Sequence, residues 1–166
     1  IPQGKVTAIV GASGSGKTTL MKMLLKFYKP TQGDIFFNSV NVKDISPKSL
    51  RENCGVVMQD GFIFSDTIKR NVVTGDENVR KEKLQSAIRI SNIEDFIESL
   101  PLKYNTKIGA SGNSISGGQK QRILIARAVY KDPHYLFFDE ATSALDAENE
   151  KKFMIICKPF SKGKPS

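Results

Sequence analysis

The sequence predicts an α/β protein with a mainly parallel sheet and an inserted helical subdomain. A short β-branched run at residues 5–10 leads directly into a glycine-rich loop and then into an amphipathic helical pattern. Two further helical patterns occupy the middle of the chain, and a second apolar run at residues 134–140 ends in two acids. With 166 residues, the chain is long enough for one domain with its own core.

The composition, 39% hydrophobic and 25% charged, is that of a soluble globular protein. The net charge of +8 is compatible with a nucleic acid or an anionic membrane as partner. The lysines are spread along the chain, however, and five lie in the last sixteen residues, so we interpret them as solvated faces and a basic tail. Cys54 and Cys157 form no metal or disulfide spacing. No stretch approaches the roughly 18 apolar residues of a membrane span.

The first part of the chain alternates strand and helix. Residues 5–10 predict a buried strand, and the helix after Gly16 has an apolar face formed by Leu20, Met23, Leu24 and Phe27. Pro30 and Gly33 mark the end of this helical region. The runs at residues 34–38 and 54–59 predict two more strands.

The middle of the chain is predicted to be helical. Residues 79–90 place Leu84, Ala87 and Ile88 on one face. Ser91 or Asn92 is expected to cap a second helix that ends before Pro101. A longer helix is expected at residues 117–131, apolar from Ile123 to Val129 except for Arg127, and a strand at residues 134–140. The tail after about residue 150 has no clear period.

The run GASGSGKT at residues 11–18 matches the phosphate-loop pattern G-x-x-x-x-G-K-[ST]. Glycines let consecutive backbone N–H groups point at phosphate oxygens, and the following helix presents its positive end to the same anion. Lys17 is expected to reach the outer phosphates, and the Thr18 hydroxyl to bind Mg²⁺. The strand before and the helix after favour this interpretation over a glycine-rich turn without a ligand.

The apolar run YLFFDE places Asp139 and Glu140 at the end of a predicted strand. Beside a phosphate loop, the first acid suits Mg²⁺ and the second suits activation of the attacking water. Alone, such acids are more often an ordinary strand end, and a lone Gln59 after a strand usually has no special role. A Ser-Gly-Gly run at residues 116–118 is expected to open the next helix, with Ser116 as a good N-cap, and would form a second anion site.

Five motifs follow one another along the chain: the phosphate loop, Gln59, ISGGQ at residues 115–119, YLFFDE, and SALD at residues 143–146. In this order they resemble the nucleotide-binding domain of ABC transporters, over residues 1–150. In detail the chain looks most like bacterial exporters of peptides or bacteriocins. The resemblance implies a P-loop NTPase core that binds ATP and Mg²⁺ and hydrolyses ATP to power export. It implies an α/β core at residues 1–59 and 116–150, a helical subdomain at residues 60–115 and an atypical, truncated tail at residues 151–166.

The resemblance also assigns roles to residues. Glu140 would be the catalytic base, with Lys17 and Gln59 in the catalytic set, and Mg²⁺ would be held by Thr18, Gln59 and Asp139. The ATP phosphates would be bound by the loop and the start of the helix, namely Gly11, Ser13, Gly14, Ser15, Gly16, Lys17, Thr18 and Thr19. Ser116, Gly118 and Gln119 would contact the nucleotide of a partner domain.

The partners implied are a second copy of the domain, paired head to tail, and a transmembrane domain in the same chain or in a partner subunit. The location implied is the cytoplasmic face of the bacterial inner membrane. Asp146 would join the dimer-coupling loop. Ile63, Phe64 and Ile68 would be apolar anchors for the membrane domain or, equally, subdomain core.

The sequence departs from the family at several positions. Ala110 and Ser111 stand where exporters often have a Glu, and the family's adenine-stacking aromatic and γ-phosphate histidine have no counterpart, since His134 precedes the acids. The chain starts at Ile1 without an initiator Met, so we expect a piece of a longer protein that binds ATP and hydrolyses it weakly by itself. Two alternatives are a soluble ABC-type ATPase acting on nucleic acid and a non-hydrolytic nucleotide-binding piece.

Overall fold

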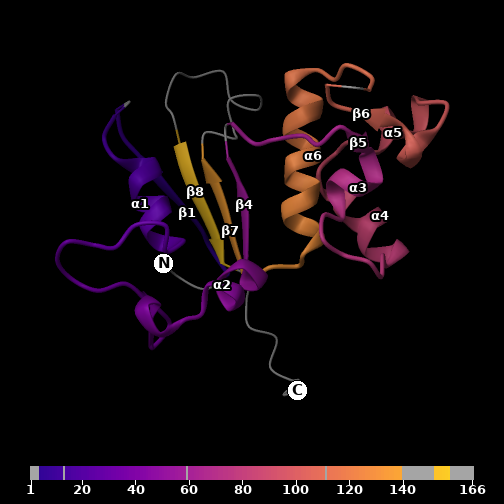
Figure 1. Ribbon diagram of the computed structural model, residues 1–166. Coiled ribbons are helices and arrows are strands. Elements are labelled where there is room, and N and C mark those ends of the chain that lie inside the picture. The colour runs from indigo at the N-terminus through magenta and orange to yellow at the C-terminus, as the bar shows by residue number, and fades with distance from the viewer. Residues whose placement is uncertain (1–3, 13, 59, 111, 140–151, 158–166) are drawn as a thin grey trace. The chain divides into compact units, whose positions relative to one another are not determined.

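The computed structural model describes residues 4–12, 14–58, 60–110, 112–139 and, for the backbone alone, 152–157 (Figure 1). By its internal contacts the chain divides into two compact units. The first unit comprises residues 1–56 and 133–166, and the second comprises residues 57–132. Residues 116–150 were instead expected to belong to the α/β core. The contacts group the helix at residues 117–130 with the second unit, because it packs on other helices there.

The first unit is built on a four-stranded sheet of order β1-β8-β7-β4. Its strands are β1 (Val6–Val10), β4 (Cys54–Val57), β7 (Tyr135–Asp139) and β8 (Lys152–Cys157). β1 and β7 both pair antiparallel with β8 and are therefore parallel to each other. Figure 1 shows β4 running in the same direction as β7. The predicted α/β class is thus confirmed. In the described part of this four-stranded sheet, β8 runs opposite to its neighbours β1 and β7.

β8 was not predicted, because the tail shows no alternating pattern. The run Lys152–Cys157 is almost wholly apolar, however, and lies between two other strands. Its register pairs Ile155 with Thr7 on one side and with Phe137 on the other. Pairing with these two strands, which are distant in sequence, therefore defines β8 rather than a pattern within the run.

The helix α1 (Lys17–Leu24) follows the phosphate loop and contacts β7. Met21 is its fully buried apolar residue, while Leu20, Met23 and Leu24 are half-buried. Phe27 is exposed, so its predicted place on the apolar face is wrong. The physical reason is that the helix ends at Leu24 and Lys26 adopts a positive φ of 62°, which turns the chain away from the helical period.

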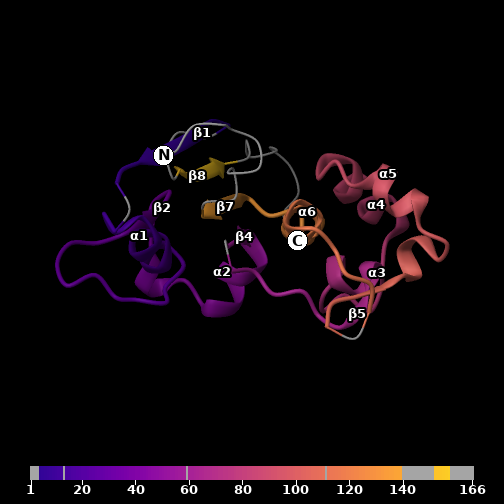
Figure 2. The same ribbon diagram turned by 90° about the horizontal axis from the view of Figure 1, so that it is seen from above.

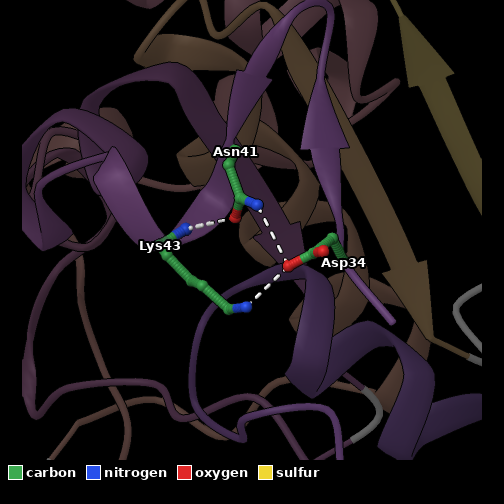
Figure 3. Close-up of polar contacts among 3 residues, drawn as sticks. All are labelled: Asp34, Asn41 and Lys43. Atoms are coloured by element: carbon green, nitrogen blue, oxygen red, sulfur yellow. Dashed lines mark hydrogen bonds and ion pairs between the residues drawn. The ribbon is translucent and has the colours of Figure 1, made fainter. Parts of the chain in front are cut away.

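Smaller elements connect α1 to β4. The predicted strand at residues 34–38 is only β2 (Phe36–Phe37), which pairs antiparallel with β3 (Val40–Asn41). Asp34 accepts hydrogen bonds at Oδ1 from Asn41 Nδ2 (3.1 Å) and Lys43 Nζ (2.6 Å), which ties the base of this hairpin to the following 3₁₀ turn (Figure 3). The helix α2 (Pro47–Asn53) was not predicted, although its start carries the signal of a Ser cap before a Pro.

The second unit is mainly helical. It contains β5 (Asp66–Thr67), α3 (Ile68–Val72), α4 (Lys81–Ile90), α5 (Glu94–Ser99), β6 (Lys107–Ile108) and α6 (Gly117–Tyr130). α6 packs against α3 and α4, which lie beside it in Figures 1 and 2. The core comprises Ile68, Val72, Val73, Leu84, Ala87, Ile88, Ile93, Ile97, Ile108, Ile123, Ala126 and Tyr130.

The predicted apolar face of α4 is confirmed, because Leu84, Ala87 and Ile88 are all buried. The predicted cap of α5 is wrong. Asn92 has a positive φ of 52° and belongs to the turn that ends α4, so Ile93 occupies the cap position without a side-chain bond. In the part of the chain described here, no helix is long and apolar enough to cross a membrane.

Candidate nucleotide-binding site

The loop between β1 and α1 has the backbone conformation that its glycines permit. Gly14 and Gly16 have φ values of 78° and 90°, in the left-handed region that side-chain-bearing residues rarely adopt. A Cβ at either position would meet nothing within 4 Å, so conformation rather than space requires glycine there. At Gly11 the reason is space, since a Cβ would lie 2.8 Å from Ser15 Oγ.

Lys17 is buried and points its ammonium into this loop. Its Nζ donates to Gly11 O (2.7 Å), Ala12 O (2.8 Å) and Ser15 Oγ (3.2 Å). None of these acceptors is ionised, so the positive charge is not neutralised by its own hydrogen bonds. Gly16, the N-cap of α1, provides no side-chain cap for the first N–H groups of the helix. The loop therefore combines a cation with a helix start that no N-cap side chain satisfies, which suits an anion site.

Thr18 and Asp139 are 121 positions apart in the sequence and meet at the start of α1 and the end of β7. Thr18 Oγ1 donates to Asp139 Oδ2 over 2.9 Å. Asp139 is only 5% exposed, and among the described residues its Oδ1 has no hydrogen-bond partner. A buried, unpaired carboxylate oxygen is costly, which makes this atom suited to a cation.

This donor set fits Mg²⁺ in particular. A hydroxyl and a carboxylate are hard oxygen ligands, and Mg²⁺ in nucleotide sites typically takes one or two protein ligands, with substrate phosphates and water completing its shell. Consistent with this, the described residues contain no cluster of three or more His, Cys, Asp or Glu that could enclose a metal without a substrate. Thr18 and Asp139 are thus the described residues that would hold the ion.

Four of the residues to which the sequence assigned a role lie outside the described residues, namely Ser13, Gln59, Glu140 and Asp146. The rest of the predicted phosphate set is brought together around the start of α1, with Thr19 on the exposed side of that helix. The roles of all these residues toward a nucleotide remain predictions.

The start of α6 carries the cap that its sequence predicts. Ser116 Oγ accepts from Gln119 N (3.2 Å), and Ser116 N donates to Gln119 Oε1 (2.8 Å), which forms a complete capping box. A Cβ at Gly117 or Gly118 would meet nothing within 4 Å, so this end of the helix is open to an approaching group. Contact of Ser116, Gly118 and Gln119 with a partner's nucleotide remains a prediction.

The segment after Gln59 separates into core and surface. Ile68 is fully buried in the core of the second unit, and Ile63 packs against that core. Phe64 is 44% exposed and lies edge to face with Phe62, which is 66% exposed, with their ring centroids 5.3 Å apart. Asn71 and Arg127 bind backbone atoms of this segment, and neither was selected from the sequence. The only sequence feature that indicated a role for them was the charge of Arg127 within an apolar run.

The fold and this site together define an α/β nucleotide-binding domain with a phosphate loop. A family model described as "ABC transporter" matches residues 1–143. The chain therefore belongs to the ABC transporter family and has the P-loop fold of its ATPase domain.

Similar proteins include exporters from several organisms. The chain is 47% identical over 93% of its length to the mitochondrial iron-sulfur clusters transporter ATM1 of Chaetomium globosum, covering 26% of that protein. It is 43% identical over its whole length to the mitochondrial iron-sulfur clusters transporter ABCB7 of Danio rerio, covering 22% of it. The solved structure of a bacterial Atm1-family ABC exporter with ATP bound matches 82% of the chain with a TM-score of 0.76 and 41% identity, covering 24% of that exporter.

The chain thus spans about a quarter of the length of these relatives. None of the three is named as a peptide or bacteriocin exporter, so they do not support that part of the sequence-based expectation. None is named as acting on nucleic acid either.

Proposed function

We propose that this chain binds and hydrolyses ATP as the motor domain of an ABC exporter. The observation that carries the proposal is the pair Thr18–Asp139 beside the buried Lys17; among the described residues, the buried Asp139 Oδ1 has no hydrogen-bond partner. A phosphate loop, an ammonium and this carboxylate oxygen lie within one unit and match the opposite charges of a magnesium–nucleotide complex.

In this proposal Lys17 and the first N–H groups of α1 bind and orient the phosphates. Thr18 and Asp139 hold Mg²⁺, which, when bound, neutralises phosphate charge that develops during transfer. Gln59 completes the metal site, and Glu140 accepts the proton of the attacking water.

We further propose that two copies act head to tail. The Ser116–Gln119 end of α6 from one copy would then contact the nucleotide in the phosphate loop of the other, with Gly117 and Gly118 leaving its N–H groups accessible. A transmembrane domain, in the same chain or in a partner subunit, would dock on the exposed pair Phe62–Phe64 at the cytoplasmic face of a membrane. Two of the relatives are named as iron-sulfur clusters transporters, which favours iron-sulfur cluster export over peptide export as the transport hypothesis.

The deciding experiment measures Mg-ATP hydrolysis by this chain across a range of protein concentrations, with Glu140→Gln as the control. A rate that rises more than linearly with protein concentration, and is lost in Glu140→Gln, supports a composite site formed by two chains with Glu140 as base. ATP binding without turnover in either protein would contradict hydrolysis by the chain alone. No ATP binding at all would refute the nucleotide site.

The transport hypothesis needs a separate measurement in the complete transporter. Reconstituted vesicles would be supplied with Mg-ATP and either an iron-sulfur cluster complex or a small peptide. ATPase stimulation by the cluster complex alone is expected. Stimulation by the peptide alone would reverse the assignment.

A further inference from the structure

The side chain of Asn71 substitutes for a strand partner of the segment that follows residue 59. Asn71 is fully buried at the end of α3. Its Oδ1 accepts from Phe64 N (2.8 Å), and its Nδ2 donates to Phe64 O (3.0 Å) and Thr67 O (3.1 Å). Its amide thereby satisfies the backbone N–H and C=O of Phe64 and binds the C=O of Thr67, in addition to the pairing of β5 with β6.

Arg127, in the last turn of α6, completes the arrangement. Its Nε donates to Asn71 O (2.7 Å), its Nη2 to Asn71 Oδ1 (3.0 Å) and its Nη1 to Phe62 O (2.8 Å). The guanidinium carbon also lies 5.1 Å from the ring centroid of Phe64. Burial lowers the pKa of Arg127 from its ordinary value. We call the pair Asn71 and Arg127 the brace.

The segment held by the brace also packs closely against its surroundings. A Cβ on Gly61 would lie 2.4 Å from Leu124 Cδ1 of α6, and one on Gly109 would lie 2.9 Å from Phe64 O. Residues 61–64 therefore have little room to shift independently of α6 and of the turn after β6. Only the rings of Phe62 and Phe64 project to solvent.

From this geometry we infer that Arg127 is a positioning residue for transport coupling: it makes the exposed Phe62–Phe64 pair and α6 move as one body. A displacement of the aromatic pair would then displace α6, and with it the Ser116 end of the helix. This inference rests on the proposed function, in which that pair receives the membrane domain and that helix end meets the partner's nucleotide.

The discriminating variant is Arg127→Lys, which keeps the positive charge and an aliphatic stem. A single ammonium cannot reproduce the fork that reaches Phe62 O and both acceptors of Asn71. The matched control is Arg122→Lys, on the same helix, whose guanidinium donates to Asn92 O outside the brace. Both variants are tested in this chain by amide hydrogen exchange and in the complete transporter, in lipid nanodiscs, by Mg-ATP hydrolysis.

In Arg127→Lys the Phe64 amide is expected to exchange about tenfold faster, while the Ser91 amide at the end of α4 changes less than about twofold. The kcat of the transporter is expected to fall about fivefold or more, with KM for Mg-ATP unchanged within about twofold. Arg122→Lys is expected to match the wild type in both measurements.

Three results would overturn the inference. Unchanged exchange at Phe64 would mean that Arg127 does not hold the segment. Faster exchange with unchanged kcat would mean that the brace is structural only. Equal acceleration at Phe64 and Ser91 would indicate general destabilisation. An inactive wild-type transporter would instead refute the proposed function and the coupling role with it, while the exchange comparison would still decide whether the brace exists.

Discussion

At the scale of single residues, the site depends on charges held without full compensation. Among the described residues, Lys17 donates to uncharged acceptors, and one buried oxygen of Asp139 has no donor. A buried carboxylate oxygen without a partner costs free energy. We therefore expect a magnesium–nucleotide complex to stabilise the first unit.

Replacing Lys17 by Met tests the cation of the loop. The change keeps the length of the side chain and removes its charge, so Mg-ATP binding is expected to weaken about ten- to a hundredfold. Isothermal titration calorimetry measures the effect. Lys22→Met, on the same helix but with its ammonium over the Tyr28 ring, is the control and is expected to bind normally. Equal affinities for the two variants would contradict the role of Lys17.

At the scale of elements, α6 is stabilised at both ends by side chains. The capping box of Ser116 and Gln119 begins the helix, and Tyr130 at its last residue reaches the α3–α4 connection. Also in its last turn, Arg127 binds the end of α3. α6 is thus the element through which the second unit is held together.

The capping box makes a prediction about stability. Ser116→Ala removes the acceptor for Gln119 N, and the free energy of unfolding is expected to fall by about 1 kcal/mol. Urea denaturation measures this directly. Ser114→Ala, at an exposed position nearby, serves as the control and is expected to be neutral. If the two variants are equally stable, the cap does not contribute.

The other end of α6 makes a prediction about pH. Tyr130 Oη donates to Asp76 Oδ2 over 2.5 Å, which lowers the pKa of Asp76 from its ordinary 3.8, while burial and this bond raise the pKa of Tyr130 above 10.0. Because the pKa of Asp76 is lowered in the folded state, its ionised form stabilises the fold above pH 3.8, and this stabilisation is lost as the pH falls through the pKa of the folded state. Because the pKa of Tyr130 is raised, its neutral form stabilises the fold below pH 10.0, and this stabilisation is lost as the pH rises through the pKa of the folded state.

The stability difference between wild type and Tyr130→Phe is therefore expected to be greatest between these limits and to shrink below about pH 4 and above about pH 10. Urea midpoints measured across pH provide the test. Tyr104→Phe, which removes a hydroxyl from elsewhere in the same unit, is the control. A difference that is constant with pH would show that the Asp76 contact contributes nothing.

At the scale of the whole molecule, the chain forms two units, and the described part of the phosphate and metal site lies in the first. Thr18 and Asp139 come from segments separated by the entire second unit in sequence. The sheet brings them together, because β7 ends beside the start of α1.

Mg-ATP is accordingly expected to protect amides unevenly at protein concentrations low enough to prevent association. Hydrogen exchange should slow at residues 14–20 and 135–139, while the amides of α4 in the second unit should change little, because a ligand stabilises the region that binds it. Lys17→Met should abolish the difference. Uniform protection of both units would contradict a nucleotide site whose described ligands all lie in the first unit.

Much of this could be predicted from local patterns. α1, α4 and α6 follow from short-range periodicity, and the phosphate loop from its glycine spacing. β1 forms where it was expected, but the prediction that it is buried is wrong, because Val6 and Val10 are exposed. The extent of α1 was overestimated, because Lys26 leaves the helical conformation despite the apolar Phe27. β8 was missed because its pairing depends on strands far away in sequence rather than on a pattern within it.

The sequence by itself determined the class of site, since backbone conformation at Gly14 and Gly16 and the chemistry of Lys17, Thr18 and Asp139 depend on residue type and spacing. Only the tertiary structure decided that Asp139 has an oxygen without a partner among the described residues, that Ile68 is core while Phe64 is surface, and that Arg127 binds Asn71. Hydrogen bonding and burial depend on neighbours many residues distant along the chain. A local pattern specifies which groups are present, whereas the fold specifies which of them meet.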